Sequence, residues 1–186
     1  MTNSTTWVID PMHSEVLFKI KHLVISTLTG SFRKFEGTII TRGDDFNDAK
    51  VNFTIDVKSI DTNQTQRDGH LHSGDFFAAD VYPQMTFKST SFLNAGGSDY
   101  KMAGNLTLRG VTKQIELNVA YGGSEDNGHG TLKHGFEITG IINRKIFGMT
   151  WNKLTDTGGL GLGEDIKLIA NIQIAKLVEE PAAITV

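Results

Sequence analysis

The densest cluster of reactive side chains in this sequence is the polar segment that runs from Arg67 to Asp75. His70 and His72, together with Asp68 or Asp75, carry nitrogen and oxygen atoms that bind metals or transfer protons. Histidines at positions i and i+2 point in different directions from a helix, whereas i and i+4 converge, so the spacing disfavours a metal site. An acid–base pair is allowed by residue type, but no activated nucleophile accompanies it.

Two non-catalytic interpretations of the same segment remain open on the residues alone. Arg67 and Asp68 can pair with nearby backbone or charged groups and hold an excursion of the chain onto the rest of the domain. Alternatively, the segment forms a polar rim that meets the head group of a ligand.

Two other constellations are weaker. His13-Ser14 lacks the strained turn and the orienting acid that a Ser–His nucleophile needs. The glycine-rich run Gly159–Gly163 precedes an expected strand instead of opening a helix, so it lacks the helix N-terminus that binds phosphate.

Composition narrows the function classes further. The chain has 186 residues, a net charge of −3, 20 glycines, three prolines and no cysteine. Absence of cysteine excludes disulfides and thiolate-ligated metals, and the scattered Lys and Arg residues give no footprint for nucleic acid. No apolar run approaches the ~20 residues that span a bilayer, so no stable membrane insertion is expected. The polar start shows no signal peptide, which favours the cytoplasm unless a leader was removed.

Alternation with period two is the main structural signal. Val51, Phe53, Ile55 and Val57 alternate with polar residues, and similar runs recur along the chain. Each run reads as a half-buried antiparallel strand, and glycine-containing breaks supply the turns between them. About eight or nine strands are expected, which favours an all-β barrel or sandwich in one domain over residues 1–178. The breaks are Gly43 to Asp48, Asn94 to Asp99, Arg109-Gly110, Gly122 to Gly130 and Gly158 to Gly163.

Two stretches interrupt the alternation. Residues 22–30 are expected to form a turn of helix, and Gln64 to Leu71 a short helix within the longer polar stretch 59–77. In a small barrel such pieces cover an opening. Residues 179–186 are expected to form a loosely held tail.

The eleven phenylalanines give the first hint of a ligand, because many of them fall on the expected dry face. An eight-stranded barrel is just wide enough to be filled by its own side chains or to hold one small ligand. The pattern alone does not decide between a solid and a hollow interior.

The ordered motifs resemble the YceI-like family of polyisoprenoid-binding, lipocalin-like proteins over about residues 7 to 176. Any one motif is weak, but their order and spacing are specific. They are Trp7 to Ser14, Phe18 with His22-Leu23, Gly30-Ser31-Phe32, Phe35-Glu36-Gly37, Ser59 to Thr62, Arg67 to Leu71, Asp75-Phe76-Phe77, Tyr82-Pro83, Phe87, Gly104 to Thr112 and Arg144 to Gly148.

This resemblance implies an antiparallel lipocalin-like barrel, open at one end under the helical excursions, that carries a long isoprenoid such as a polyprenyl phosphate or a quinone. It also implies a homodimer, a non-enzymatic role in lipid transport, and no cofactor besides the lipid. By position, the polar mouth is Arg67, Asp68 and His70. The expected apolar wall comprises Phe18, Phe32, Phe35, Phe76, Phe77, Phe87, Leu106 and Phe136. A ligand-free structural or stress-response scaffold and an enzyme acting on a lipid through His70 and Asp68 are the alternatives.

Overall fold

The computed structural model describes residues 4–43, 45–126, 128 and 130–178; the expected tail at 179–186 lies outside them. The described part holds eleven strands, and every strand pairs antiparallel with its neighbours in one sheet. The strands are β1 (Ser4–Ile9), β2 (Glu15–His22), β3 (Ser26–Phe32), β4 (Phe35–Arg42), β5 (Asp45–Asp56), β6 (Ile60–Asp61), β7 (Gln84–Gly96), β8 (Asp99–Leu108), β9 (Val111–Asp126), β10 (Leu132–Asn143) and β11 (Leu162–Lys176).

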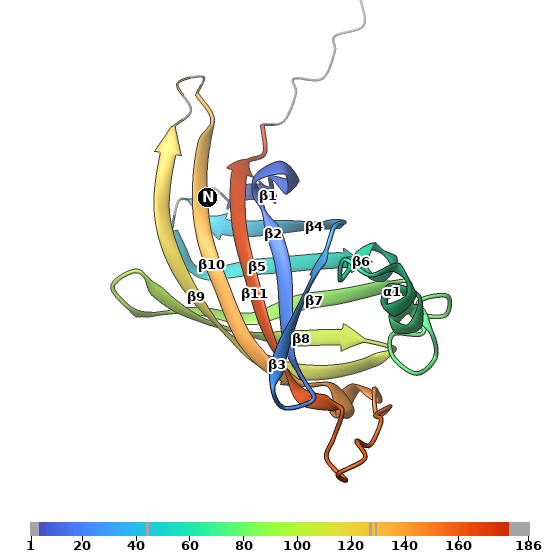
Figure 1. The fold of residues 1–186 in the computed structure, drawn as a ribbon. Coiled ribbons are helices and arrows are strands. Elements are labelled where there is room, and N and C mark those ends of the chain that lie inside the picture. The colour runs from blue at the N-terminus through green and yellow to red at the C-terminus, as the bar shows by residue number, and fades with distance from the viewer. Residues whose placement is uncertain (1–3, 44, 127, 129, 179–186) are drawn as a thin grey trace, which may run out of the picture.

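Eight of these strands close into a barrel in the order β1-β4-β5-β7-β8-β9-β10-β11, because β11 pairs back onto β1 (Figure 1). The long β11 contacts β1 only near its end, where Ile174 pairs with Ile9, and contacts β2 along its earlier part, where Leu168 pairs with Phe18. The strands β2, β3 and β6 therefore form an extension that leaves the barrel wall. This architecture confirms the predicted all-β, antiparallel, lipocalin-like barrel of about eight strands.

The sidedness of the strands follows the alternation in the sequence. In β8, Met102, Gly104, Leu106 and Leu108 are buried, while the residues between them are exposed or half-buried. The buried positions of the other barrel strands belong to the same contiguous core. Successive residues of each strand therefore face alternately the inside and the outside of one closed barrel wall.

One end of the barrel is filled by an aromatic plug, which we define as Trp7, Phe46, Tyr121, His134 and Phe136. The ring of Trp7 meets His134 edge-on at 4.6 Å, and Phe46 meets Phe136 edge-on at 5.0 Å. The hydroxyl of Tyr121 lies 2.9 Å from Nδ1 of His134. Aromatic edges packed on faces fill this end, which we call the closed end.

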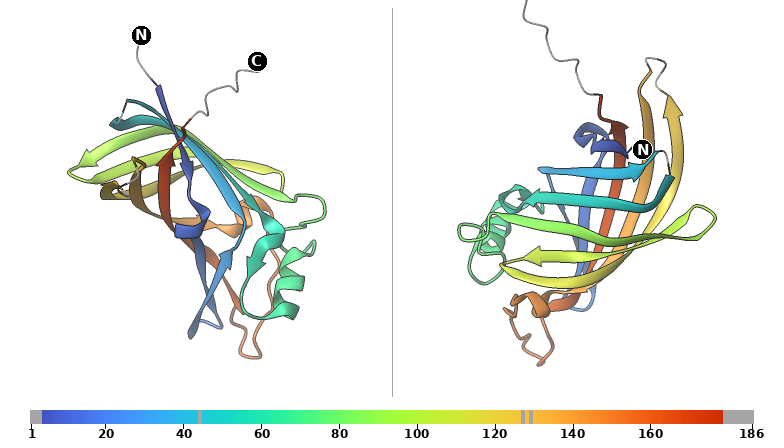
Figure 2. Two further views of the ribbon diagram at one scale, coloured as in Figure 1. Left: turned by 90° about the horizontal axis from the view of Figure 1, so that it is seen from above. Right: turned by 180° about the vertical axis from the view of Figure 1, so that it is seen from behind.

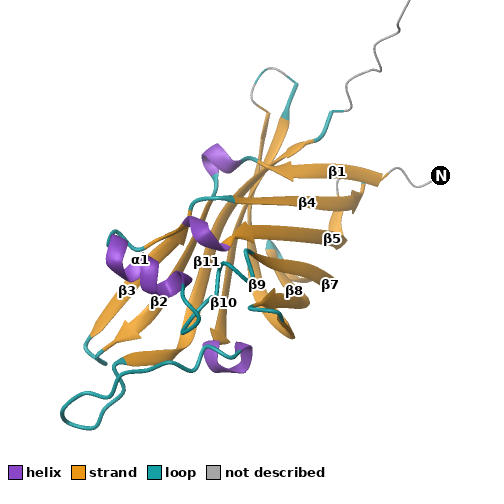
Figure 3. Cartoon of the chain, turned by 90° about the vertical axis from the view of Figure 1, so that its right-hand side faces the viewer, coloured by secondary structure: helices purple, strands orange, loops and turns teal. Residues whose placement is uncertain are grey.

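The helix α1, the short helix after β10 and the extension lie away from the start of β1 (Figures 2 and 3). The helix predicted for 64–71 is confirmed as α1 (Thr65–His72). None of the helices in the described ranges is long and apolar enough to cross a bilayer. The short 3₁₀ helices are η1 (Pro11–His13), η2 (Val57–Ser59) and η3 (Arg144–Phe147).

One local prediction was wrong, and two predicted breaks have slightly different bounds. Residues 22–30 form the β2–β3 hairpin instead of a helical turn, and both Leu23 (φ 51°) and Val24 (φ 65°) adopt left-handed backbone conformations. Side chains of this type rarely adopt that conformation, so the residues carry no turn signal. The break predicted for Gly122 to Gly130 starts later than expected, because β9 runs on to Asp126 and β10 begins at Leu132. The break predicted for Gly158 to Gly163 falls in the long loop that joins β10 to β11, although β11 already begins at Leu162.

Candidate functional site

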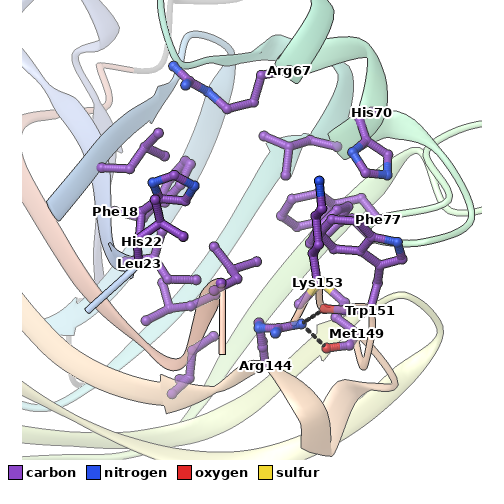
Figure 4. Close-up of a pocket in the computed structure, with 18 of the residues that line it drawn as sticks. Phe18, His22, Leu23, Arg67, His70, Phe77, Arg144, Met149, Trp151 and Lys153 are labelled. Atoms are coloured by element: carbon purple, nitrogen blue, oxygen red, sulfur yellow. Dashed lines mark hydrogen bonds between the residues drawn. The ribbon is translucent and has the colours of Figure 1, made fainter. Parts of the chain in front are cut away.

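A cavity of about 840 Å³ lies between the β2–β3 hairpin, α1 and the loop after η3 (Figure 4). This volume falls within the ~300–1,000 Å³ typical of small-molecule sites. Strands from both the barrel and the extension supply its apolar wall, which includes Ile20, Leu28, Met85, Leu108, Ile142, Leu162, Ile166 and Leu168.

A second, inner cavity of about 160 Å³ lies within the barrel core and adjoins the first. The two cavities share a set of lining side chains that we call the junction: Phe18, Phe32, Met85, Ile142 and Leu168. All five are apolar. No polar side chain is therefore among those that the two cavities share.

The ring of Phe18 takes its place in the junction because of a glycine on the neighbouring strand. Phe18 pairs with Gly30 across β2 and β3, and a Cβ atom at Gly30 would lie 2.3 Å from the Phe18 ring. A glycine is thus required for the ring to lie flat over β3. The Phe32 ring lies 5.6 Å from that of Phe18 and meets Phe77 edge-on at 6.0 Å.

Hydrogen bonds to Thr62 hold the first turn of α1 in place. Arg67 donates from Nε to the Thr62 hydroxyl (2.7 Å) and from Nη2 to the Thr62 carbonyl (2.6 Å). Asp68 accepts from the Thr62 amide (3.0 Å) and hydroxyl (2.5 Å). The anchoring interpretation of this segment therefore holds for both side chains. Arg67 also lines the large cavity, whereas Asp68 lines neither cavity.

His70 also lines the large cavity, and its carboxylate partner is Asp75, at 2.8 Å from Nε2, not Asp68. The His70 ring packs edge-on against Phe76 and Trp151. The acid–base pair considered for the enzyme alternative is thus not assembled. Within the described ranges, no three His, Cys, Asp or Glu side chains gather where they could hold a metal ion.

The residues predicted to form the apolar wall divide into three groups. Four of them line the large cavity: Phe18, Phe32, Phe76 and Phe77. Three, besides the junction residues, line the inner cavity: Phe87, Leu106 and Phe136. Phe35 lines neither cavity; it is half-buried and its ring stacks on Phe53 at 5.9 Å.

Arg144, at the start of η3, lines the large cavity and was missed by sequence reasoning. Its side chain is 1% exposed. Nε donates to the carbonyl of Gly163 (2.8 Å), and Nη1 donates to those of Met149 (2.6 Å) and Trp151 (2.8 Å). The loop between η3 and β11 is therefore wrapped around this guanidinium, and burial lowers the pKa of Arg144 from its ordinary value. The Arg144 to Gly148 motif was recognised, but a single arginine after a strand gave no sign of its role.

Arg109 joins the two sides of the large cavity. It occupies a tight turn between β8 and β9 with φ of 52°, and its Nη1 donates to the carbonyls of Phe76 and Gly148, each at 3.0 Å. The segment after α1 and the loop after η3 are thus tied to one side chain. In the sequence, Arg109-Gly110 indicated a turn between two strands but not these hydrogen bonds.

The polar groups around the large cavity carry an excess of positive charge. Arg67, Arg144 and Lys153 line it, against one carboxylate from Asp156. A cavity with a mainly apolar wall and a few positively charged side chains suits an amphiphile better than a purely apolar molecule.

A closed antiparallel barrel with an apolar internal cavity defines a lipocalin-like ligand-binding barrel. The family model described as the YceI-like domain matches residues 7–174, and the chain belongs to this family. A UPF0312 protein of Staphylococcus aureus (strain USA300) is 36% identical over 172 residues, which are 92% of this chain and 98% of that protein.

Solved structures share the fold. The YceI protein of Campylobacter jejuni superimposes with a TM-score of 0.73 at 34% identity, covering 87% of this chain and 91% of that one. BcnA of Burkholderia cenocepacia gives 0.75 at 24% identity, with 89% and 98% covered. A polyisoprenoid-binding domain from Saccharophagus degradans gives 0.65 at 17% identity, with 93% and 99% covered.

Proposed function

We propose that this protein binds one long isoprenoid-type lipid inside its barrel and acts as a carrier, storage or sequestering protein, not as an enzyme. The observation that carries the proposal is the 840 Å³ cavity, whose wall is largely apolar and which borders an apolar inner cavity along the junction. A flexible hydrocarbon chain that lies against these apolar side chains gains ~0.8 kcal/mol for each CH₂ removed from water. No covalent or metal contact is needed for such binding.

Three further observations favour this proposal. A ligand-free scaffold calls for a filled barrel, whereas the large cavity lies open between α1 and the β2–β3 hairpin. An enzyme that uses His70 with Asp68 calls for the two side chains to meet, and each has another partner. The Saccharophagus degradans domain, which has the same fold, is described as polyisoprenoid-binding. The homodimer, the cytoplasmic location and the absence of a cofactor besides the lipid stay predictions.

Native mass spectrometry of protein purified without detergent, followed by organic extraction, tests the proposal directly. We expect a stoichiometric long-chain isoprenoid or quinone. An empty protein that also fails to take up added geranylgeraniol would contradict it.

A matched pair of variants on β3 tests whether the lipid occupies this cavity. Leu28 lines the cavity, whereas the next residue, Thr29, is exposed on the other face of the strand. Leu28→Trp fills part of the space and should weaken binding of geranylgeraniol by about tenfold or more. Thr29→Trp adds the same side chain outside and should leave binding unchanged. Equal affinity in the two variants would place the lipid elsewhere.

A further inference from the structure

The turn between β2 and β3 exposes three large apolar side chains in succession, Leu23, Val24 and Ile25. A hairpin turn ordinarily takes Gly, Asn or Asp, and the left-handed φ of Leu23 and Val24 makes apolar residues unfavourable there. Consecutive exposed apolar residues on a folded domain mark an interaction site. The turn therefore carries side chains that suit contact with another molecule better than they suit the turn itself.

Two more exposed apolar residues join this turn from the loop after η3. Leu154 and Leu160 pair across a short antiparallel bridge, so their side chains lie on the same side of the loop. The amide of Leu23 donates to the carbonyl of Gly161 at 2.9 Å, which holds the turn beside that loop. Both segments lie at the same end of the molecule (Figures 1 and 3). We call the five residues the tip patch: Leu23, Val24, Ile25, Leu154 and Leu160.

The tip patch borders the opening of the large cavity. Leu23 and Leu154 line the cavity and are exposed as well, so they lie where the cavity meets the solvent. Figure 4 shows Leu23 and Lys153, the residue before Leu154, on opposite sides of the cavity. A ligand that crosses this opening passes next to the tip patch.

Unpaired lysines accompany the tip patch. Residues 18–28 and 150–168, which carry the patch and the strands beside it, hold four lysines and three acids. One of the acids, Glu164, is paired with Lys145 at 2.6 Å, whereas none of the four lysines forms an ion pair in the described part of the chain. The lysines are Lys19, Lys21, Lys153 and Lys167. Positive charge is therefore in excess here, which complements anionic lipid head groups.

The size of the tip patch favours a membrane surface over a protein partner. A stable protein–protein interface takes ~20–30 residues from each side, far more than the patch provides. Two protruding turns insert apolar side chains among lipid head groups without a shaped partner, and lysines beside them reach water and phosphate. The apolar ligand proposed above is also found in membranes and not free in water.

We propose that the tip patch docks this protein reversibly on a bilayer that contains anionic lipids, with the opening of the large cavity toward the membrane. A lipid then passes between the bilayer and the cavity without crossing water. Docking is measurable without any ligand, so its failure is distinguishable from failure of the proposed function.

Flotation with vesicles tests the docking. We expect the unmodified protein to bind vesicles of phosphatidylcholine mixed with phosphatidylglycerol, and to bind less at high salt or to phosphatidylcholine alone. Ile25→Asp places a charge in the patch and should weaken binding about tenfold or more. Met12→Asp is the matched control, since Met12 and Ile25 are both 87% exposed but lie at opposite ends of β2 (Figure 1). It adds the same charge away from the patch and should leave binding nearly unchanged.

Loss of vesicle binding in Ile25→Asp but not in Met12→Asp supports docking through the tip patch. Geranylgeraniol should bind to Ile25→Asp as to the unmodified protein, because Ile25 lines neither cavity. Failure of the unmodified protein to bind vesicles, or equal binding by the two variants, would overturn the docking. A concentration-dependent dimer that Ile25→Asp alone disrupts, with no vesicle binding, would assign the patch to a contact between two copies and also overturn it. Absence of both vesicle binding and geranylgeraniol binding would overturn the docking and the proposed function together.

Discussion

The two tryptophans of this chain lie in the two functional regions of the barrel, and their surroundings differ. Trp7, at the closed end, is 0% exposed and its indole N–H donates to the Thr41 hydroxyl at 2.9 Å. Trp151, on the large cavity, is half-buried and lies against His70 and Phe76. One ring completes a core, and the other lines a space that a ligand can occupy.

Backbone conformation separates the two regions in the same way. Among the described residues, six that are not glycine have a left-handed φ, and just one, Asp48, lies in a strand of the closed end. The other five surround the large cavity or the elements that carry it: Leu23, Val24, Asn63, Ala78 and Arg109. Asn tolerates a left-handed φ, so the strained residues among them are the other four. Strain of this kind concentrates where function constrains the backbone. The closed end therefore stabilises the barrel, and the cavity end carries conformations that stability alone does not favour.

The largest expected effect is at Trp7. Trp7→Ala removes a completely buried ring from the aromatic plug and leaves Thr41 without its indole donor. We expect a loss of ~3–5 kcal/mol in the free energy of unfolding. Chemical denaturation measures this change. Geranylgeraniol should still bind to the fraction that remains folded, because Trp7 lines neither cavity.

Trp151→Ala is the matched control at the cavity. It should cost less stability, since the ring is half-buried, but it should weaken lipid binding clearly. If Trp151→Ala destabilised the protein as much as Trp7→Ala and left binding intact, the contrast between the two regions would be wrong.

Asp10 gives the next largest effect and ties β1 to the strands β10 and β11 near the closed end. It accepts hydrogen bonds from His13 (2.9 Å), Lys133 (3.0 Å) and Gln173 (3.2 Å). Partial burial acts to raise the pKa of Asp10, but these bonds and the Met12 amide outweigh it and lower the pKa from 3.8 to about 2. The carboxylate therefore stabilises the fold fully above pH 3.8, and this contribution is lost as the pH falls through about 2.

We expect Asp10→Asn to lose ~1–2 kcal/mol at pH 7 and the difference from the unmodified protein to shrink as the pH falls from 4 toward 2. Urea titrations at several pH values measure it. The exposed Asp99 supplies a control, since Asp99→Asn should change stability little. A difference for Asp10→Asn that stays constant down to pH 2 would show that the charge of Asp10 is not the cause.

The barrel could be predicted from the sequence because each strand has one dry face, which leaves a period-two pattern in the residues themselves. The helix α1 could be predicted because its polar stretch interrupts that period-two pattern. The site was harder. Phe18 and Phe32 were found because aromatic residues mark a dry face, but no local signal distinguishes them from Phe35, which packs on Phe53 instead.

Arg144 could not be assigned from the sequence, because its role depends on contacts that are distant along the chain. The carbonyl of Gly163 is 19 residues away, and its position depends on how the loop after η3 folds back. Charge patterns along a sequence identify exposed clusters, whereas the role of a single buried charge becomes visible only when the groups around it in the fold are known.

The smallest expected effect is at the tip of the β2–β3 hairpin. Val24 is 75% exposed and has φ of 65°, a conformation that a β-branched residue adopts at a cost. Asn tolerates this conformation better, so Val24→Asn should raise the free energy of unfolding by ~0.5–1 kcal/mol, measured by thermal and urea denaturation. Ile25→Asn is the control: Ile25 is 87% exposed in the same turn without a left-handed φ, and its replacement should leave stability nearly unchanged. Equal stabilisation by both variants would assign the effect to removal of exposed apolar surface, and the argument that strain gathers around the cavity would lose one of its four residues.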